Sequence, residues 1–496
     1  MTKKKELAPL ELSTKNVLLT PRRPATARRA GHVAMAGAAV AQREIPGRGV
    51  GLVAARDIDA GETIVAEHAL LVGVSEEFRR VCCASCLAHG AATPCSGCGE
   101  VVLCDACVDP ASPWHRGAGH GAVVCAAERV ASAWRPPLSA PDRERLRFLG
   151  ACAELRRAHV VNGDARARAR LDAVLRLCPD VGPAGEGIDP REASAAERVR
   201  PALEAAVQAI IASTEANTAG GGLRAIAGDA VENAALLAKE TKNAFGVMAA
   251  HHRADGSHSN DDSDDDRRVR GGAVYELASR VNHACFPNVA RFDNFDGVLT
   301  SPSHEFHVPR RDGANPPGPT ELRLVAIDKI PAGCEVTMSY LPVSESCARR
   351  RRRLRNTFGF GCDCERCVIE CAWAREDGTA TGDEGGAFED ASRRAREARD
   401  EAAELEADAY ADALDRESNE LEETANRSLD DAERTRRADR IPATYALWFV
   451  RNMCPVDGCG GTLAPPHVTA DHMTCNYCGA RRGDEEFFRR LDAGAG

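Results

Sequence analysis

The sequence predicts an α+β protein in which short strands frame a helical insertion and several cysteine-rich segments. Apolar and polar residues alternate around glycine-rich turns at 40–74, and strand-like segments return at 321–327 and 335–340. Between them, residues 127–248 are rich in Ala, Leu, Arg and Glu, with apolar residues every three or four positions, which predicts helices. Most of the 21 cysteines fall in close pairs, a spacing typical of metal ligands.

Composition limits the classes of function that the chain can have. Its 496 residues, 44% of them hydrophobic, can bury a sizeable core. No apolar run is long enough to cross a bilayer, and the first residues lack the apolar stretch of a secretory signal. We therefore expect a protein of the cytoplasm or nucleus with reduced thiols. A net charge of −10 disfavours nucleic acid as the main partner, because duplex affinity depends on neutralising phosphates, and favours a basic protein.

Three segments have compositions that do not support a packed core. Residues 1–38 form a basic tail that we expect to be disordered, serving as a nuclear signal, an organelle transit peptide or a solubilising tail. The acidic run within 258–266 predicts a flexible loop. Residues 384–437 are Ala/Glu/Arg-rich with few bulky apolar side chains, which indicates exposed helices or a solvated spacer.

Cysteine spacing predicts two zinc sites between residues 82 and 126. Three CxxC pairs are followed by a histidine and a further cysteine, which makes eight ligands and hence two tetrahedral sites. A cross-braced arrangement joins the first and third pairs on one ion and gives the second pair to the histidine and the last cysteine. His115 is an alternative to the histidine chosen, and Cys82 is a weaker alternative to Cys83. The eight predicted ligands are Cys83, Cys86, Cys95, Cys98, Cys104, Cys107, His120 and Cys125.

A third site is incomplete within its own segment. Cys362, Cys364 and Cys367 offer three thiolates, one fewer than a structural site needs, and Cys285 can complete it. Such a site would tie this segment to the turn that carries Cys285 and would place Phe360 over whatever that turn binds.

A fourth site resembles a zinc ribbon. Its predicted ligands are Cys454, Cys459, Cys475 and Cys478, with glycines near both hooks and with His467 and His472 as possible substitutes. The remaining cysteines have no partner by spacing, and we expect buried or incidental thiols there: Cys152, Cys178, Cys334, Cys347 and Cys371.

Five motifs in a fixed order carry a resemblance to a known family. They are residues 47–52 (GRGVGL), the cysteine cluster, residues 282–288 (NHACFPN), residues 332–340 (AGCEVTMSY) and the FxCxCxxC segment. Together they resemble the SET-and-MYND class of protein lysine methyltransferases. The resemblance implies a SET-domain β core split by insertions, with this organisation: basic tail 1–38, SET N-terminal part 39–81, MYND-type zinc finger 82–126, helical SET insert with acidic loop 127–270, SET C-terminal part 271–345, post-SET zinc segment 346–371, helical spacer 372–445 and zinc-ribbon-like segment 446–496.

The resemblance also implies which residues hold the methyl donor, S-adenosylmethionine. In the family a GxG turn, a helical asparagine, an Asn-His pair and an aromatic residue packed on the adenine contact the donor, and a tyrosine stands at the point of methyl transfer. The glycines let the backbone approach the ligand. The matching positions are Arg48, Gly49, Gly51, Asn243, Asn282, His283, Phe360 and Tyr340.

The implied activity is S-adenosylmethionine-dependent N-methylation of lysines in histones or other proteins, with three or four structural zinc ions. The attacking amine must be neutral although a free lysine has a pKa of about 10.4, so a dry channel is expected around it. An alternative is an inactive adaptor whose MYND-like finger binds proline-containing peptides. A RING-type ubiquitin ligase is disfavoured because it leaves Asn282 and Phe360 without a role.

Three positions depart from the family pattern. Cys334 stands where the family usually has Glu, and Phe358 stands where it commonly has Tyr, which leaves one fewer polar group near the lysine channel. The spacing of Cys104 and Cys107 is one residue shorter than usual. None of these changes removes a donor contact or Tyr340.

Overall fold

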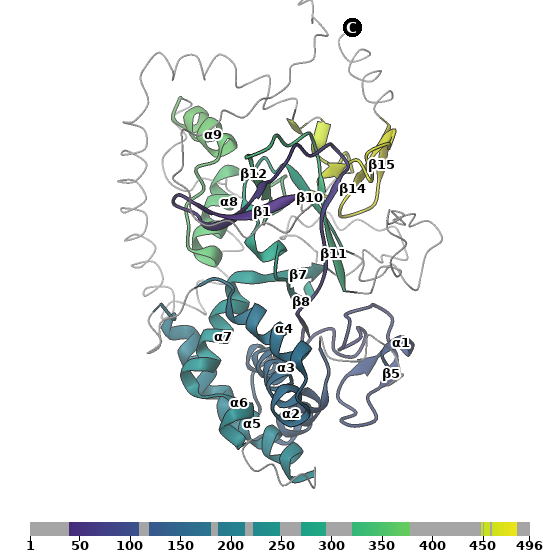
Figure 1. The fold of residues 1–496 in the computed structure, drawn as a ribbon, viewed down its shortest axis with the longest axis vertical. Helices are drawn as coiled ribbons and strands as arrows, with labels where there is room; N and C mark the ends of the chain where they lie inside the picture. Colours follow the sequence, from purple (N-terminus) through teal and green to yellow (C-terminus); the bar gives the residue numbers. More distant parts are fainter. Residues whose placement is uncertain are drawn as a thin grey trace, which may run out of the picture.

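The computed structural model describes residues 39–108, 119–179, 187–213, 222–248, 269–293, 320–376, 448–449, 451–456 and 459–483 (Figure 1). The predictions for the basic tail, the acidic loop, residues 384–437 and His115 lie outside these residues. Within the described part, no helix has both the length and the apolar character that crossing a membrane requires.

One sheet brings together strands from distant parts of the sequence. β1 (Val40–Ile45) and β2 (Gly49–Ala54) form an antiparallel hairpin. β2 pairs with β12 (Glu335–Met338), which in turn runs parallel to the short β9 (Asn282–His283). The GxG turn, the Asn-His pair and the strand that leads to Tyr340 are therefore neighbours in one sheet, with order β1-β2-β12-β9.

Two further sheets complete what we call the strand region. The first has the order β10 (Val289–Asp293), β11 (Glu321–Ala326) and β3 (Thr63–His68), and the second has the order β4 (Leu71–Val74), β8 (Val269–Val274) and β7 (Ala244–Met248).

The prediction that helix extends to residue 248 is wrong for 244–248. The apolar run in that segment pairs with β8 along its whole length, and this sheet pairing overrides the helical pattern before it.

The helical region covers one end of the strand region (Figure 1). Its helices are α2 (Ala122–Ala133), α3 (Ala140–Asn162), α4 (Ala165–Leu175), α5 (Pro190–Ser213), α6 (Leu223–Ala227) and α7 (Ala230–Asn243). The predicted apolar stripe on α5 is confirmed, since Leu203, Ala206 and Val207 are buried. α7 begins with a capping box between Asp229 and Glu232, which satisfies backbone N–H groups at the helix start.

The finger module, residues 82–126, contains β5 (Thr93–Pro94), β6 (Val102–Leu103) and α1 (Asp105–Val108). Its last predicted ligand, Cys125, lies in the first turns of α2, so the predicted end of the module at residue 126 falls inside that helix. Behind the module, the buried Arg147 of α3 pairs with Glu128 and Glu76 and donates to the carbonyl of Val74 at 3.3 Å. This ion network joins α2 and α3 to the chain that enters the finger module.

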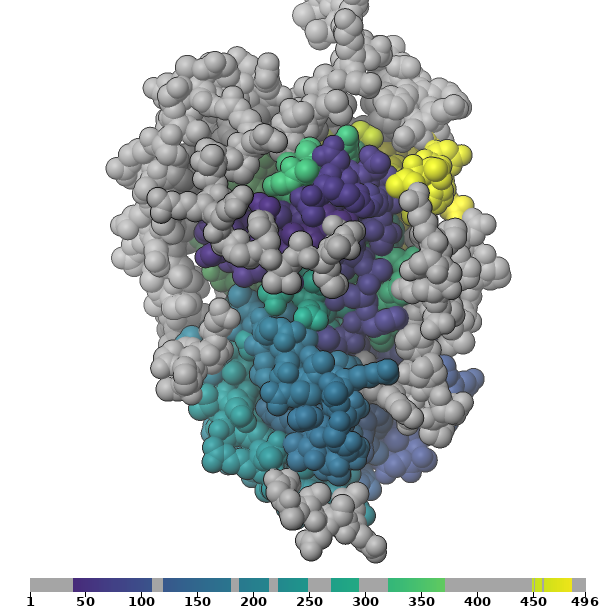
Figure 2. All heavy atoms as spheres, viewed as in Figure 1, coloured from purple at the N-terminus to yellow at the C-terminus, as the bar shows by residue number. Residues whose placement is uncertain are grey.

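After Tyr340 the chain forms α8 (Cys347–Arg353), the π-helical turn η2 (Leu354–Phe358) and α9 (Glu365–Glu376). The C-terminal module, residues 448–483, contains β13 (Leu463–Ala464), β14 (His472–Cys475) and β15 (Arg481–Gly483). Its yellow atoms lie beside the purple N-terminal strands in Figure 2.

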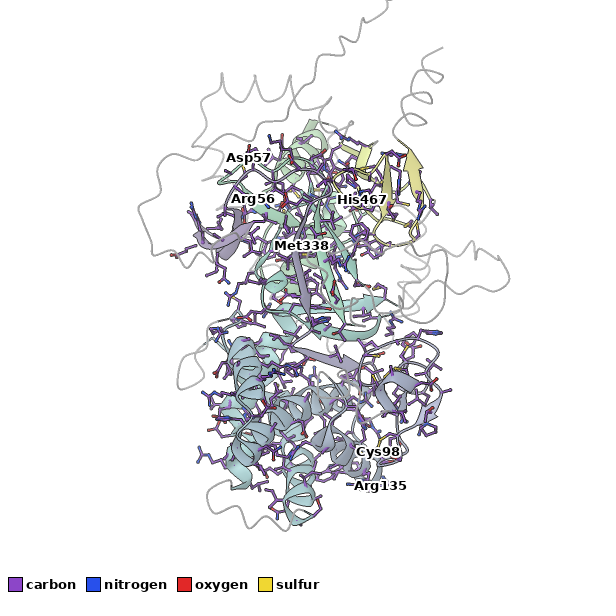
Figure 3. All side chains as sticks on the ribbon, turned by 45° about the vertical axis from the view of Figure 1, so that its right-hand side comes forward. Arg56, Asp57, Cys98, Arg135, Met338 and His467 are labelled. Carbon is purple, nitrogen blue, oxygen red and sulfur yellow. The ribbon has the colours of Figure 1, made fainter. Side chains whose placement is uncertain are left out.

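Close contacts hold the C-terminal module against the strand region. Ala464 is buried with Ala290 and Ile327, and Val343 N donates to the carbonyl of Gly460 at 3.2 Å. A Cβ atom at Gly61 would lie 2.4 Å from the backbone oxygen of His467, so only glycine permits this approach. Figure 3 shows His467 near the upper strands, and Cys98 of the finger module at the opposite end of the molecule.

Candidate functional site

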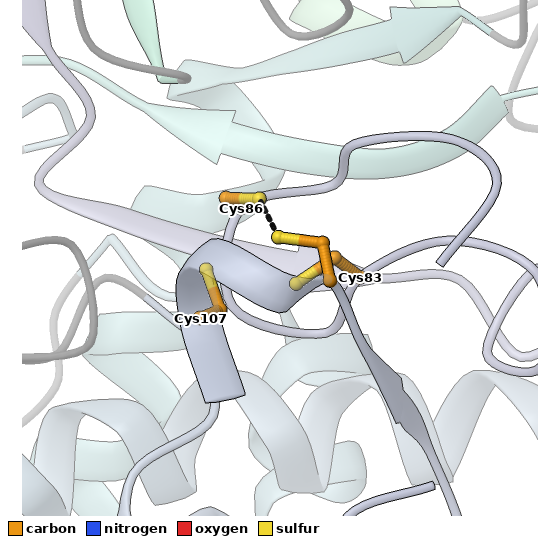
Figure 4. A group of neighbouring side chains, drawn as sticks. Cys83, Cys86 and Cys107 are labelled. Carbon is orange, nitrogen blue, oxygen red and sulfur yellow. Dashed lines mark hydrogen bonds between the residues drawn. The ribbon is translucent and has the colours of Figure 1, made fainter. Parts of the chain in front are cut away.

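Within the described residues, four groups of side chains have the arrangement of metal ligands. In each group the four candidate ligand atoms all lie within 4.8 Å of one another, and each group is one of the four sets predicted from spacing. Figure 4 shows Cys83, Cys86 and Cys107 arranged around α1. We call the first two groups the finger clusters, the third the body cluster and the fourth the ribbon cluster: Cys83, Cys86, Cys104 and Cys107; Cys95, Cys98, His120 and Cys125; Cys285, Cys362, Cys364 and Cys367; Cys454, Cys459, Cys475 and Cys478.

The sulfur separations fit zinc. With Zn–S bonds of about 2.3 Å, a tetrahedral site has sulfur–sulfur edges of about 3.8 Å. The observed distances are 3.7 Å for Cys86–Cys104, 3.9 Å for Cys285–Cys362 and 3.6 Å for Cys459–Cys475. A disulfide would require about 2.05 Å. The donor sets, four sulfurs or three sulfurs and an imidazole, are those of structural zinc sites.

The histidines are distributed as follows. His120 Nε2 lies 3.3 Å from Cys95 Sγ and 3.7 Å from Cys98 Sγ, so this nitrogen faces the second finger cluster. His467 instead pairs with Thr469, and His472 pairs with Asp471. The ribbon cluster therefore consists of four sulfurs.

Thiols without a predicted partner lie outside the four clusters of the described residues. Cys152 is fully buried among apolar helix residues, whereas Cys178 is exposed. Cys334 and Cys347 are half-buried. No side chain is described for Cys371.

Asn282 is held by the strands on both sides of it. Its Nδ2 donates to Glu335 Oε1 at 2.8 Å. A Cβ atom at Gly51 would lie 2.8 Å from the same Nδ2, so glycine at this position allows β2 to approach the Asn282 side chain. Gly49 has a φ of +69° with open space around it, which shows a need for the left-handed backbone conformation. The two glycines of the GxG turn thus serve different local purposes.

Arg48 links the hairpin turn to the cysteine-rich segment. Its guanidinium donates to Asp363 Oδ1 at 2.8 Å and to the carbonyl of His283 at 3.4 Å, and lies 3.6 Å from Glu335. Arg48 therefore contacts both the Asn282 turn and the segment that supplies Cys362, Cys364 and Cys367.

The tautomer of His283 follows from its two neighbours. Tyr340 N donates to Nδ1 at 3.1 Å, so in the neutral ring the proton must be on Nε2. Burial lowers the pKa of His283 to about 3, which keeps the ring neutral. Nε2 lies 3.2 Å from Cys285 Sγ. His283 therefore connects the backbone of Tyr340 to a sulfur of the body cluster.

Tyr340 lies among aromatic rings two residues after β12. Its hydroxyl donates to the carbonyl of Val281 at 2.8 Å. Ring centroids lie 4.9 Å away for Phe358 and 6.4 Å away for Phe360, and Phe360 is 6.1 Å from His283. Burial raises the pKa of Tyr340, so the phenol stays protonated. The structure thus brings the predicted Tyr340, His283 and Phe360 together.

Asn243 has a local role as well as the one implied by the resemblance. It is the last residue of α7, and its buried amide donates to the carbonyl of Lys239 at 2.7 Å and to that of Cys178. Its own carbonyl accepts from Ser279 Oγ at 3.3 Å, just before the Asn282 turn. Asn243 therefore joins the end of α7 to the approach of that turn.

Two carboxylates were missed by the sequence reasoning. Glu335 accepts from Asn282 and pairs with Arg48. Glu67, on β3, accepts from the backbone N–H groups of Glu276, Leu277 and Ala278 at 3.1, 3.1 and 2.6 Å, which fixes the segment leading to Val281. Both glutamates stand in segments that the sequence predicts to be strands, and nothing in the local pattern distinguishes them from the other polar residues there.

Known proteins of similar sequence identify the family of this chain. The SET domain family profile matches residues 49–341, more than half of the chain. Histone-lysine N-methyltransferase ASHR2 of Arabidopsis thaliana is 28% identical over 89% of this chain and 95% of its own length. A SET and MYND domain-containing protein of Dictyostelium discoideum is 26% identical over 20% of this chain and 19% of its own length.

A solved structure, the SET domain of LSMT bound to lysine and AdoHcy, aligns with 66% of this chain and 54% of that chain. The alignment has a TM-score of 0.28 and 12% identity, values too low to say anything about the site. The family profile is the decisive match, because it covers Gly49 and Gly51, the Asn282 turn and Tyr340. The chain belongs to the SET-domain family and is similar to its SET and MYND domain-containing members.

Proposed function

We propose that the chain is an S-adenosylmethionine-dependent protein-lysine N-methyltransferase. The observation that carries the proposal is the meeting of the Asn282 turn, Tyr340 and Phe360 beside the body cluster, in a chain of the SET-domain family. The relative that aligns along nearly its whole length is named a histone-lysine N-methyltransferase, which supports the same activity.

The donor-binding residues are proposed to be Arg48, Gly49, Gly51, Asn243, Asn282, His283 and Phe360. S-adenosylmethionine, when bound, supplies a methyl group on a positively charged sulfonium. Phe360 is half-buried and leaves part of its ring available for stacking on an adenine. Arg48 and Asn282 are positioned through Glu335, so the chain orients both sides of the donor site with one carboxylate.

Tyr340 is proposed as the catalytic residue that orients the lysine nitrogen. Its hydroxyl proton is committed to the carbonyl of Val281, so the oxygen lone pairs are free to accept an N–H from the substrate amine. The surrounding Phe358, Phe360 and neutral His283 exclude water and disfavour the ammonium form. A neutral amine held in line with the methyl group is the reactive arrangement.

Finer assignments belong to the same proposal. The finger module is proposed to be a MYND-type finger that can bind proline-containing peptides, residues 346–371 a post-SET segment, and the C-terminal module a zinc-ribbon-like extension. Substrates are proposed to be lysines of histones or other proteins, and the location to be the cytoplasm, the nucleus or both. The enzyme must bind the donor whereas an inactive adaptor need not, so calorimetric titration with S-adenosylmethionine separates the two.

The proposal is tested by Tyr340→Phe. Loss of the hydroxyl removes the hydrogen bond that orients the amine and should lower turnover by a factor on the order of 100 or more, because such groups contribute that much. Donor affinity, measured by calorimetry, should stay within about twofold, since ring packing is retained.

Tyr477→Phe provides the control, because Tyr477 is an exposed tyrosine of the C-terminal module. Turnover is followed with labelled donor in a cell extract, with methylated lysines identified by mass spectrometry. Wild-type turnover in Tyr340→Phe would remove Tyr340 from the mechanism.

A further inference from the structure

The body cluster has a buried guanidinium against its sulfurs. Arg350, on α8, has no exposed surface. Its Nε lies 3.2 Å from Cys285 Sγ and its Nη2 lies 3.8 Å from Cys367 Sγ. Both distances are within hydrogen-bonding range for sulfur, so one side chain contacts two of the four ligands.

The charge of the cluster explains why such a contact is needed. Four thiolates around a divalent cation carry a net charge of −2, and the sulfurs of Cys285, Cys362 and Cys367 belong to buried residues. A buried net charge is costly unless it is paired and hydrogen-bonded. A guanidinium stays protonated in proteins and offers several N–H donors in one plane, so it can offset part of that charge while donating to the sulfurs.

The remaining donors of Arg350 are also occupied, which holds the guanidinium in place. Nη1 donates to the carbonyl of Glu345, and Nη2 pairs with Glu370. Glu370 also accepts from Arg366 Nε at 2.8 Å, and Arg366 Nη1 donates to the carbonyl of Val343 at 2.8 Å. The orientation of Arg350 toward the sulfurs is therefore set by α9 and by the segment that follows Tyr340.

The same network reaches the C-terminal module. The Arg366 guanidinium carbon lies 4.4 Å from the ring centroid of Phe449, and Phe449 is 5.7 Å from Phe286 of the Asn282 turn. A cation over an aromatic face is stabilising, particularly when it is removed from water. Arg366 is buried, so this contact is shielded from solvent.

We propose that Arg350 is an outer-sphere ligand of the body cluster, a positioning residue that compensates its charge and slows loss of its zinc. Residues that hydrogen-bond to metal ligands typically change metal affinity about 10-fold to 100-fold when they are substituted. The effect is expected at this cluster alone, because Arg350 contacts Cys285 and Cys367.

The test compares Arg350→Met with Arg352→Met in full-length, zinc-loaded protein. Met keeps the length of the apolar stem but removes the charge and the donors, and Arg352 is an exposed arginine of the same helix. Zinc release to a chromophoric chelator is followed together with thiol alkylation and peptide mass spectrometry. In Arg350→Met one zinc equivalent should leave about 10-fold faster or more, with new alkylation at Cys285, Cys362, Cys364 and Cys367. Arg352→Met should match the wild type.

Arg350→Lys keeps the test decisive if Arg350→Met does not fold. Lysine retains the charge but not the planar set of donors, so its release rate should lie between those of the wild type and Arg350→Met. Wild-type release from the body cluster in a folded Arg350 variant would overturn the proposal. Parallel acceleration at all four clusters would also overturn it, since that result indicates general destabilisation. Neither readout requires methyl transfer, so this proposal can fail or survive independently of the proposed function.

Discussion

The first finger cluster and the body cluster each consist of four cysteine sulfurs, but they join very different lengths of chain. In the first finger cluster, Cys86 and Cys104 are 18 residues apart and 3.7 Å apart in space. In the body cluster, Cys285 and Cys367 are 82 residues apart and 3.6 Å apart. A finger cluster therefore closes short local loops, whereas the body cluster joins the Asn282 turn to the segment that carries Phe360.

This difference determines what each metal site can control. Metal binding is linked to folding of the segments that supply the ligands, because the unfolded chain does not hold those ligands together. For the finger module those segments are local. For the body cluster they include His283, which contacts both Cys285 Sγ and the backbone of Tyr340. We therefore expect loss of the body cluster to disrupt the site and loss of a finger cluster to disrupt mainly stability.

The largest expected effect comes from comparing Cys364→Ser with Cys86→Ser. Cys364 Sγ accepts from the backbone N–H of Cys285 at 3.4 Å, so its loss should release the Asn282 turn and weaken donor binding by roughly 100-fold. Cys86→Ser should leave donor affinity within about threefold, because the first finger cluster and the donor site are separate and substitutions at separate sites act independently. Calorimetry with S-adenosylmethionine measures both, with zinc content as the check on loading. Equal losses in the two variants would contradict the contrast drawn between the clusters.

A smaller effect, confined to stability, is expected from Glu128→Gln behind the finger module. The change removes the charge that pairs with buried Arg147 and should cost about 3 kcal/mol, the low end for a broken buried pair because Glu76 still contacts Arg147. Urea unfolding provides the measurement.

Glu197→Gln is the control for Glu128→Gln, since Glu197 forms an exposed pair with Arg200 and should change stability little. Donor affinity should be unchanged in both variants. A stability loss without a change in donor affinity would support the view that the finger module contributes to stability and the body cluster to the donor site. Weakened donor binding in Glu128→Gln would contradict that view.

Glu335→Gln should weaken donor binding without changing stability, which is the reverse of the result expected for Glu128→Gln. The effect should also be smaller. Gln can still accept from Asn282 but loses the ion pair with Arg48, which lies at 3.6 Å and is partly exposed. Such pairs contribute up to about 1 kcal/mol, which corresponds to a loss of donor affinity of about fivefold or less. The unfolding midpoint should not move measurably. If donor affinity stays at the wild-type value, Glu335 does not position the donor site.

The smallest effect concerns a thiol outside the clusters. Burial raises the pKa of Cys152 to about 12, so its thiol stays protonated at pH 8 and its thiolate, the reactive form, is scarce. Native protein treated with iodoacetamide at pH 8 should therefore be labelled at the exposed Cys178 and not at Cys152. Reactivity at Cys152 should rise as the pH approaches its pKa. Rapid labelling of Cys152 at pH 8 would contradict this expectation, because it would show that the helical region opens to solvent.

The ligand sets could be derived from the sequence because local spacing limits which atoms can share an ion. CxxC pairs predicted both finger clusters, and one CxxC pair with a longer hook, Cys454 and Cys459, predicted the ribbon cluster. The count of three thiols at 362–367 required a fourth ligand from elsewhere. The alternation of apolar and polar residues predicted strands at β2, β3, β11 and β12, and the apolar stripe predicted the buried face of α5. Residues 244–248 were misassigned because an apolar run after a helix has no local signal that distinguishes it from one more helical turn.

By itself, the sequence determined the candidate metal ligands and the α+β class, since both depend on residue type and spacing. The residues proposed for the donor, and the role proposed for Tyr340, came from the resemblance of the motifs to a known family. Only the tertiary structure decided that Arg350 lies against two sulfurs, that Glu335 serves both Arg48 and Asn282, and that His283 carries its proton on Nε2. These contacts join residues far apart in the chain. Their partners are selected by how the sheets and helices pack, which residue spacing does not encode.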